Sequence, residues 1–279
     1  MKFKYLGTAA AEGIPAIFCN CDTCKKAREL GGKNIRTRSQ SIIDGKLLID
    51  LPADSYHHMI TNDLNFADIG AILISHVHPD HFYPNELEMH KKGFAYGCKP
   101  LTVCGSQDLL VPFTEKVEIF QLWDSEESDN RVKLRVLRAF EKFEILGYNV
   151  TPIPAVHGTS NPFIYAIEKD GKTLLYAHDT DVLPEKTIEK MRELDLKFDF
   201  VSLDCTEGSK ILKYVGHMCI DRNVRFREAF LAAGLADEKT VFAINHFSHN
   251  GLNACYDEML PVANENGFVL SYDGMEIEI

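Results

Sequence analysis

Apolar and polar residues follow one another along this chain in short blocks, and most apolar blocks have the length of a strand. The block 69–74 is rich in β-branched residues and ends at a polar cluster, which is typical of a buried strand. Asp44-Gly45 and Asp170-Gly171 each separate two apolar blocks, as the turn of a β-hairpin does. Further blocks that predict strands lie at 2–7, 149–156, 172–177, 240–244 and 268–271.

Apolar residues at helical spacing fill much of the chain between these blocks. The segments that predict helices are 84–92, 108–120, 184–194, 223–233 and 255–264. The strands fall into two groups flanked by helices, and the last residues, 269–279, predict a hairpin. The pattern therefore indicates an α/β fold in which two sheets pack face to face with helices outside. Because no repeat or low-complexity linker interrupts it, we expect one domain over 1–279.

Histidine and aspartate directly follow four of the predicted strands. After 69–74 comes an H-x-H-x-D-H loop, which contains His76, His78, Asp80 and His81. The other three strands end on His157, on His178-Asp179 and on Asn245-His246. Imidazole and carboxylate ligands suit zinc, manganese or iron better than calcium or magnesium. This recurrence is what a metal site along one edge of a sheet requires.

The H-x-H-x-D-H loop is a specific signal. With 11 His in 279 residues, it should arise by chance with a probability on the order of one in a thousand. The alternative is a histidine-rich capping loop in which each ring satisfies a backbone group, and the further ligand-type residues after other strands argue against it.

The order of these motifs resembles the metallo-β-lactamase superfamily over nearly the whole chain. The resemblance implies an αββα sandwich with a dinuclear metal site. It assigns His76, His78 and His157 to one metal and Asp80, His81 and His246 to the other, with Asp179 as the bridge. Since true β-lactamases typically replace the histidine that corresponds to His81, the phosphodiesterase branch is the nearer likeness. Within it the chain resembles the phosphoribosyl cyclic phosphodiesterases of the carbon–phosphorus lyase pathway and, more distantly, tRNase Z.

A C-x-C-x-x-C loop follows the first predicted strand and contains Cys19, Cys21 and Cys24. A closed tetrahedral zinc needs a fourth ligand. The resemblance supplies His249, three residues after the last histidine of the dinuclear site, and so implies a structural zinc. A redox cluster, a disulfide pair or plain buried thiols are the alternatives.

Two further residues take roles from the resemblance. His217, in a Gly-His context, matches a histidine that contacts the scissile phosphate or protonates the leaving oxygen, although a lone histidine is more often a filler. Asp50 matches a carboxylate that supports the ligand loop, and an ordinary turn carboxylate is an equal alternative. Asp80 and Asp179 would reduce the positive charge of the metal pair, which lowers the pKa of water.

Composition places the chain among ordinary globular proteins, with 45% hydrophobic and 25% charged residues. No apolar stretch is long enough to span a bilayer, and the start of the sequence lacks the apolar core of a signal peptide. Eight cysteines, three of them in one metal-type cluster, favour a reducing compartment. We therefore predict a cytoplasmic protein with no membrane partner.

The net charge of −11 comes from 41 acidic and 30 basic residues, and the densest charged run, 124–129, is acidic. Nucleic-acid binders usually carry a basic stripe, and tRNase Z carries a long arm that this chain lacks, so a nucleic-acid partner is not expected. The short basic groups Lys25-Lys26 and 36–38 could instead steer a small anion. The acidic surface does not forbid a homodimer.

The sequence thus favours a phosphoric diester hydrolase with two divalent metals, zinc or manganese with iron as a third option, and one structural zinc. Its expected substrate is a small phosphodiester, such as a cyclic ribose phosphate. A thioester or lactone hydrolase of the same superfamily is one alternative. Another is a non-hydrolytic member related to pyrroloquinoline quinone biosynthesis, in which the ligand set is incomplete, whereas all seven positions are filled here.

Overall fold

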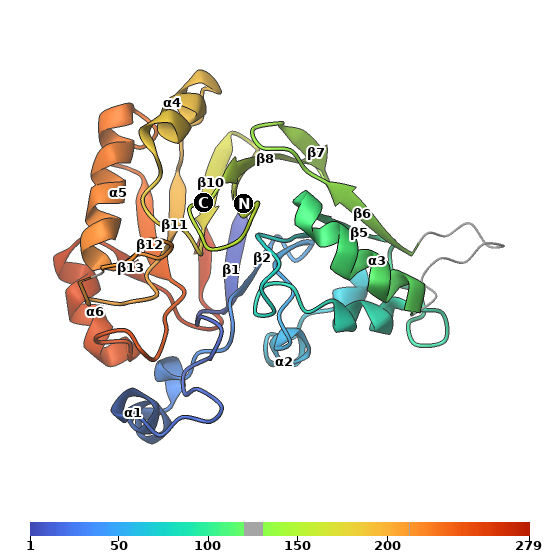
Figure 1. Ribbon diagram of the computed structural model, residues 1–279, viewed down its shortest axis with the longest axis horizontal. Coiled ribbons are helices and arrows are strands. Elements are labelled where there is room, and N and C mark those ends of the chain that lie inside the picture. The colour runs from blue at the N-terminus through green and yellow to red at the C-terminus, as the bar shows by residue number, and fades with distance from the viewer. Residues whose placement is uncertain (120–130, 212) are drawn as a thin grey trace.

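The computed structural model describes residues 1–119, 131–211 and 213–279, and in this part of the chain fourteen strands form two seven-stranded sheets (Figure 1). In spatial order, the first sheet contains β14 (Glu276–Glu278), β1 (Lys2–Gly7), β2 (Gln40–Ile43), β3 (Leu47–Ile49), β4 (Ala71–Leu73), β5 (Leu101–Gly105) and β6 (Val132–Val136). The second contains β13 (Val269–Leu270), β12 (Val241–Asn245), β11 (Phe200–Asp204), β10 (Lys172–Ala177), β9 (Phe163–Lys169), β8 (Tyr148–Pro154) and β7 (Phe143–Ile145).

Both sheets are mixed, and each has a parallel half. In the first sheet β3, β4, β5 and β6 are parallel neighbours, and in the second β10, β11, β12 and β13 are. The remaining pairs are antiparallel. Parallel strands bring their carboxyl ends to one edge of a sheet, which is where the polar motifs lie.

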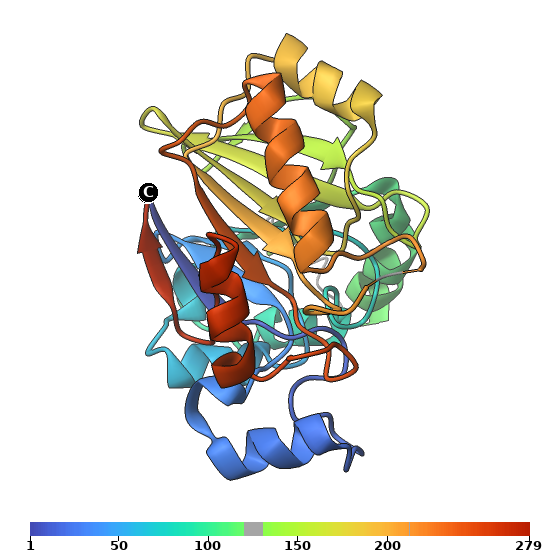
Figure 2. The ribbon, with the colours of Figure 1, turned by 90° about the vertical axis from the view of Figure 1, so that its left-hand side faces the viewer.

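Helices cover the outer faces of the two sheets (Figures 1 and 2). The helices are α1 (Asp22–Leu30), α2 (Ser55–Thr61), α3 (Leu110–Ile119), α4 (Glu185–Glu193), α5 (Ile220–Ala233) and α6 (Tyr256–Glu265). Short 3₁₀ helices occur at η1 (Gly32–Asn34), η2 (Phe66–Asp68), η3 (Pro84–His90) and η4 (Gln107–Leu109). Figure 2 shows α5 and α6 lying across the face of the second sheet.

Three apolar clusters correspond to the interfaces between these layers. Phe3, Tyr165 and Phe200 belong to the cluster between the two sheets. A second cluster contains Phe226 and Phe230 of α5 together with residues from the outer face of the second sheet, and a third lies on the outer face of the first sheet. The predicted αββα sandwich is therefore confirmed. In the described part of the chain, no helix is long and apolar enough to cross a membrane.

Several sequence-based boundaries differ from the structure. The segment 269–279 is not a hairpin, because β13 pairs with β12 in one sheet and β14 with β1 in the other. The predicted helix 84–92 is a 3₁₀ helix over Pro84–His90. Strands β5, β6, β7 and β11 and helices α1 and α2 were not predicted. The acidic run 124–129 and the end of the predicted helix 108–120 lie outside the described residues.

Candidate metal centre and active site

The loops after β4, β8, β10 and β12 bring the predicted dinuclear ligands together at one edge of the sandwich. Their ligand atoms form two groups, and within each group the atoms lie within 4.8 Å of one another. The first group is His76, His78 and His157, and the second is Asp80, His81, Asp179 and His246. The first group is the set predicted for one metal, and the second combines the set predicted for the other metal with Asp179, the predicted bridge.

In the first group, ring nitrogens face one another at hydrogen-bonding distances. His76 Nε2 lies 2.9 Å and His157 Nε2 3.2 Å from His78 Nδ1. The rings of His76 and His78 meet edge to face, with centroids 4.6 Å apart. Three nitrogen lone pairs that converge in this way suit a divalent transition metal.

Asp179 lies between the two groups. Its Oδ2 atom is 2.5 Å from His81 Nε2 and 3.1 Å from His246 Nε2. The same carboxylate lies 3.9 Å from Nε2 of both His76 and His157. Oδ2 is buried and accepts no regular hydrogen bond. A buried carboxylate oxygen surrounded by imidazole nitrogens fits a cation better than it fits an uncharged interior.

The outer nitrogens of the ligand rings are held by the protein, so the inner nitrogens are fixed in place. His81 Nδ1 lies 2.7 Å from Asp50 Oδ2, and His157 Nδ1 lies 3.0 Å from the carbonyl oxygen of Gly216. A nitrogen that faces a carbonyl must donate its proton, so Nε2 of His157 carries the lone pair. His246 Nδ1 lies 2.9 Å from Thr206 Oγ1. Such partners set the tautomer and orientation of metal-binding histidines.

The Asp50 carboxylate supports the ligand loop, as the resemblance implies. It is fully buried, its Oδ1 accepts the backbone N–H of Ser75 at 2.8 Å, and its Oδ2 faces His81. Its backbone, like that of Asp179 and His246, has a left-handed φ: 66°, 50° and 65°, respectively. At all three positions this conformation ends the strand and turns the side chain into the site. Left-handed backbone is costly for residues other than glycine and gathers at functional sites.

Electrostatics of the two groups favour a bound cation. Burial lowers the pKa of His76 well below its ordinary value, which leaves a neutral ring with a free lone pair. Burial acts in the same direction on His81 and His246, but the Asp179 carboxylate outweighs it and raises the pKa of His246 to about 10. The negative charge that attracts these protons equally attracts a metal ion.

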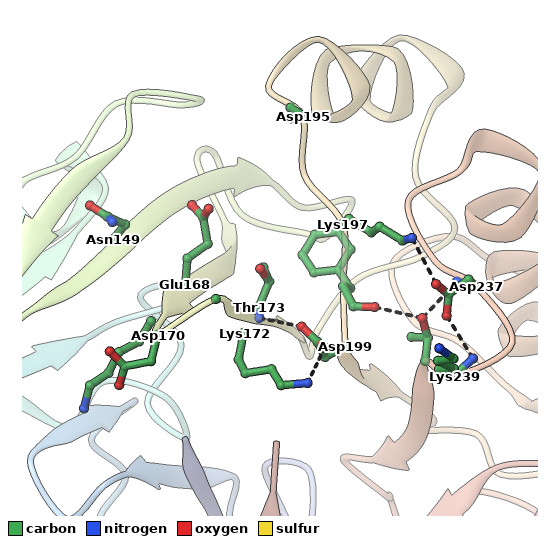
Figure 3. A pocket seen from close by; sticks show the side chains of 14 residues that line it. Asn149, Glu168, Asp170, Lys172, Thr173, Asp195, Lys197, Asp199, Asp237 and Lys239 are labelled. Atoms are coloured by element: carbon green, nitrogen blue, oxygen red, sulfur yellow. Dashed lines mark hydrogen bonds and ion pairs between the residues drawn. The ribbon is translucent and has the colours of Figure 1, made fainter.

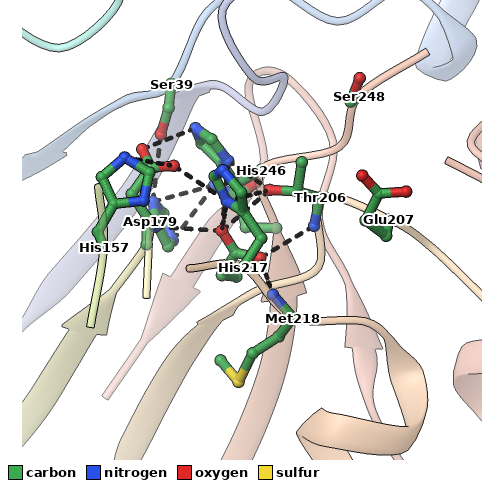
Figure 4. A network of polar contacts seen from close by, with 12 residues as sticks. Ser39, His157, Asp179, Thr206, Glu207, His217, Met218, His246 and Ser248 are labelled. Atoms are coloured by element: carbon green, nitrogen blue, oxygen red, sulfur yellow. Dashed lines mark hydrogen bonds and ion pairs between the residues drawn. The ribbon is translucent and has the colours of Figure 1, made fainter. Parts of the chain in front are cut away.

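His217 reaches the same site from the loop before α5 (Figure 4). Its Nδ1 atom lies 3.1 Å from Asp204 Oδ2 and 3.2 Å from Thr206 Oγ1, and its ring is 4.8 Å from that of His157. Since Nδ1 is engaged, Nε2 is the nitrogen left for a ligand in the cavity that His217 lines. The structure thus places His217 beside the candidate metal ligands and at the cavity, and its contact to a substrate stays a prediction.

Asp204, at the carboxyl end of β11, is a functional residue that the sequence reasoning missed. It is fully buried and close enough to His217 and His246 to count as a ligand. Its oxygens, however, accept backbone N–H groups of Met218 (2.8 Å), Thr206 (3.0 Å) and Asp179 (3.2 Å), so they are occupied. Asp204 therefore orients His217 and its neighbours. The signal was available, since 200–204 is a further apolar run that ends on an aspartate.

The cysteine loop forms a second candidate metal centre. The sulfur atoms of Cys19, Cys21 and Cys24 and a ring nitrogen of His249 lie within 4.8 Å of one another. His249 Nδ1 is 3.4 Å from Cys21 Sγ and 3.6 Å from Cys19 Sγ, and all eight cysteines are free. Cys21 and Cys24 stand three residues apart at the start of α1, which places them on one face. Three thiols and one imidazole form the ligand set of a closed zinc site.

A cavity of about 330 Å³ opens above the two ligand groups and is lined by His78, His157 and His217 among others. A larger one, of about 550 Å³, lies at the opposite end of the second sheet (Figure 3). Two of its lysines are paired within the lining, Lys172 with Asp199 at 2.7 Å and Lys197 with Asp237 at 3.0 Å. Surface charges of both signs line the larger cavity, whereas the smaller one lies over the candidate ligand groups and is the candidate active site.

The fold and this site define the class of protein. The chain belongs to the beta-lactamase superfamily, because residues 49–245 match the model of the beta-lactamase superfamily domain. This confirms the resemblance seen in the sequence motifs, and the superfamily implies binding of divalent metal.

Solved structures cover the whole chain at low sequence identity. Zinc-bound PqqB from Methylobacterium extorquens has a TM-score of 0.75 and 18% identity over 100% of both chains. A diphosphatase from the PhnP family has a TM-score of 0.74 and 20% identity, covering 100% of this chain and 97% of its own. Human short-form tRNase Z has a TM-score of 0.61 and 15% identity, covering 100% and 99%. At these identities the likeness shows the fold alone. No curated protein matches the sequence.

Proposed function

We propose that this protein is a metal-dependent phosphodiesterase with two metals in its active site, acting on a small phosphodiester such as a cyclic ribose phosphate. The observation that carries the proposal is the position of His217 beside both ligand groups, with Nδ1 held by Asp204 and its ring lining the cavity. A hydrolase that expels an alkoxide needs a proton donor at this place, in addition to its metals.

The residues present fit two divalent cations. His76, His78 and His157 would hold one, Asp80, His81 and His246 the other, and Asp179 reaches both groups. When bound, such cations lower the pKa of water and offset the negative charge of a phosphodiester. Zinc and manganese both suit this ligand set, with iron as the third option. Cys19, Cys21, Cys24 and His249 would hold a structural zinc.

Side chains of the protein would supply proton transfer, negative charge next to the cations and orientation of the ligand rings. Asp204 holds the Nδ1 proton of His217, and its negative charge favours the doubly protonated ring, whose Nε2–H can give its proton to the leaving oxygen or donate a hydrogen bond to the phosphate. Asp80 and Asp179 add negative charge next to the cations, which keeps the attacking water nucleophilic. Asp50 and Thr206 keep His81 and His246 in the orientation that binding requires.

The proposal is tested by hydrolysis of ribose 1,2-cyclic phosphate beside a thioester and a lactone, with protein loaded in turn with manganese and zinc. We expect selective cleavage of the cyclic diester, and a loss of about 10²-fold or more in kcat for His217→Ala with unchanged metal content. His57→Ala, at an exposed histidine, is the matched control. Cleavage of the thioester or lactone alone would move the protein to the acyl-hydrolase branch.

A non-hydrolytic role related to pyrroloquinoline quinone biosynthesis is the second candidate, and the likeness to zinc-bound PqqB favours it. The seven filled ligand positions favour hydrolysis instead. Two bound metals without turnover of any of the three substrates would support the non-hydrolytic role. The cytoplasmic location, the absence of a nucleic-acid partner and a homodimer stay predictions.

A further inference from the structure

The outer wall of the active-site cavity has an unusual charge for an enzyme of phosphate esters. Beyond the predicted metal ligands, it carries Glu12, Glu207 and the uncharged groups of Tyr214, Ser248 and Asn250. Among the described residues, no lysine or arginine lines this cavity. The metals would offset the charge of one phosphodiester. Two cations contact the wall from outside, Lys210 at Glu207 and Arg38 at the carbonyl of Ala11, and each is paired with a carboxylate.

The two wall carboxylates differ in how they are compensated. Glu207 is buried, accepts the hydroxyl of Tyr214 and pairs with Lys210 at 3.0 Å. Glu12 is 39% exposed, and its only ion-pair contact in the described part of the chain is with His249 Nε2 at 4.0 Å. The uncompensated charge of the wall is therefore that of Glu12.

Three of the basic residues that the sequence suggested for steering an anion are either buried or paired with a carboxylate. Arg36 is buried, with its guanidinium 4.4 Å from the centre of the Phe247 ring. Arg38 pairs with Asp54 at 3.1 Å, and Lys26 pairs with Glu258. Steering of an anion by Lys25-Lys26 and 36–38 stays a prediction, and these contacts leave the Glu12 carboxylate at the cavity mouth without a lysine or arginine partner among the described residues.

Glu12 is held at the mouth by the loop that carries His249. Its carboxylate oxygens lie 3.4 Å from Ser248 Oγ, and one lies 3.3 Å from Asn250 Nδ2. The other nitrogen of the His249 ring faces Cys19 and Cys21. His249 therefore contacts both the cysteine centre and Glu12. The hydrogen bonds to Glu12 from Ser248 and Asn250 are long, so its carboxylate oxygens can still accept a hydrogen bond from a ligand.

We propose that Glu12 determines substrate specificity, selecting phosphodiesters whose remaining part is uncharged and rich in hydroxyl groups and rejecting those that carry a second phosphate. The inference rests on the proposed phosphodiesterase function. Sugar hydroxyls can donate hydrogen bonds to the Glu12 carboxylate, whereas a terminal phosphate would stand beside it as a like charge in a cavity whose described lining contains no lysine or arginine. The substrate class is then the cyclic phosphodiester of a free sugar, and not of a sugar phosphate.

The test compares kcat/KM for ribose 1,2-cyclic phosphate and for the same compound phosphorylated at O5, using metal-loaded protein. We expect the wild-type protein to prefer the first by about tenfold, and less at high salt. Glu12→Gln should bring the ratio close to one, and Glu12→Lys should reverse it. Glu144→Gln, which removes the same charge from an exposed position on β7, should keep the wild-type ratio.

A second readout does not depend on turnover. Calorimetry should give a dissociation constant about tenfold lower for ribose 1-phosphate than for ribose 1,5-bisphosphate, and Glu12→Gln should remove the difference. Equal use of both substrates by the wild-type protein, or a ratio that Glu12→Gln leaves unchanged, overturns the inference and leaves the phosphodiesterase proposal intact. If neither diester is cleaved, the phosphodiesterase proposal fails for this class, and the calorimetric difference alone decides the role of Glu12.

Discussion

His217 lines the cavity, but the group that fixes its ring is Asp204. The Asp204 carboxylate lies behind the ring at 3.1 Å and is fully buried, and it accepts hydrogen bonds from backbone N–H groups and from the Thr206 hydroxyl at 2.9 Å. Burial opposes its ionisation, but the neighbouring His217 outweighs that effect and lowers the pKa of Asp204 below its usual range. Asp204 is therefore an anion at neutral pH and a fixed acceptor for the Nδ1 proton.

We predict that Asp204→Asn lowers kcat about 10- to 100-fold and changes metal content little, because an amide nitrogen at Oδ2 cannot accept the Nδ1 proton. The pH profile of kcat should shift as well, which a merely structural role would not cause. Asp221→Asn, at an exposed carboxylate of α5, serves as the control. Wild-type kcat in Asp204→Asn would remove Asp204 from the mechanism.

At the scale of elements, helix α2 shows how one buried histidine ties a short helix to a sheet. His58 Nδ1 lies 2.8 Å from Gln40 Oε1 on β2, and His58 Nε2 lies 2.6 Å from Thr37 Oγ1. Burial lowers the pKa of His58 to about 4, so the ring is neutral in the folded protein. In the unfolded chain the same ring titrates near its ordinary pKa of about 6.5.

This difference makes the anchoring of α2 sensitive to pH. Between about pH 6.5 and pH 4 the unfolded state binds a proton that the folded state does not, so the free energy of unfolding falls as pH falls. We expect His58 to contribute a loss of about 2 kcal/mol between pH 7 and pH 5. Urea unfolding of the wild type and of His58→Gln at both pH values measures it, and equal pH slopes in the two proteins would contradict the prediction.

The elements that the sequence predicts best are those whose apolar runs end abruptly on a ligand-type residue, such as β4 and β10. Most of the missed elements lack that contrast, although β11, which ends on Asp204, has it and was overlooked. Helix α2 has the sequence Ser-Tyr-His-His-Met-Ile-Thr and only seven residues, too few to show a helical period. The two strands of the C-terminal segment looked like a hairpin because local pattern cannot tell which sheet a strand joins. Partner choice depends on contacts between distant residues, as with β14 beside β1.

The candidate site likewise contains residues that the sequence predicts and residues that it misses. Sequence motifs located the candidate metal ligands because histidine and aspartate have few reasons to recur at strand ends, and the structure brings all seven together. Glu12 escaped notice because an isolated carboxylate has no distinctive spacing, whereas Asp204 was overlooked although it ends an apolar run. Their importance comes from what lies next to them in space: His217 for Asp204, and the cavity mouth for Glu12.

At the scale of the whole molecule, both candidate metal centres join segments that are far apart in the chain. The cysteine centre links residue 19 to residue 249, and the two ligand groups link four loops between His76 and His246. Cations bound at such places stabilise the folded state, because the unfolded chain does not hold the ligands together.

We therefore expect chelation to lower the Tm by at least about 5 °C, as measured by calorimetry before and after removal of metal. Cys24→Ser should reduce total bound metal by one equivalent, with two retained, whereas Cys98→Ser, outside the ligand groups, should retain three. An unchanged Tm after verified loss of metal would show that the centres do not contribute to stability.

The left-handed backbone of Asp50, Asp179 and His246 has a consequence for the evolution of this chain. At His246 it costs about 1 kcal/mol that glycine would not cost, so selection for stability alone would replace this histidine. A lineage in which the activity was no longer needed would gain stability by replacing His246 early. Among homologues, an aspartate or histidine retained at these three strand ends therefore marks the branches in which the chemistry is still under selection.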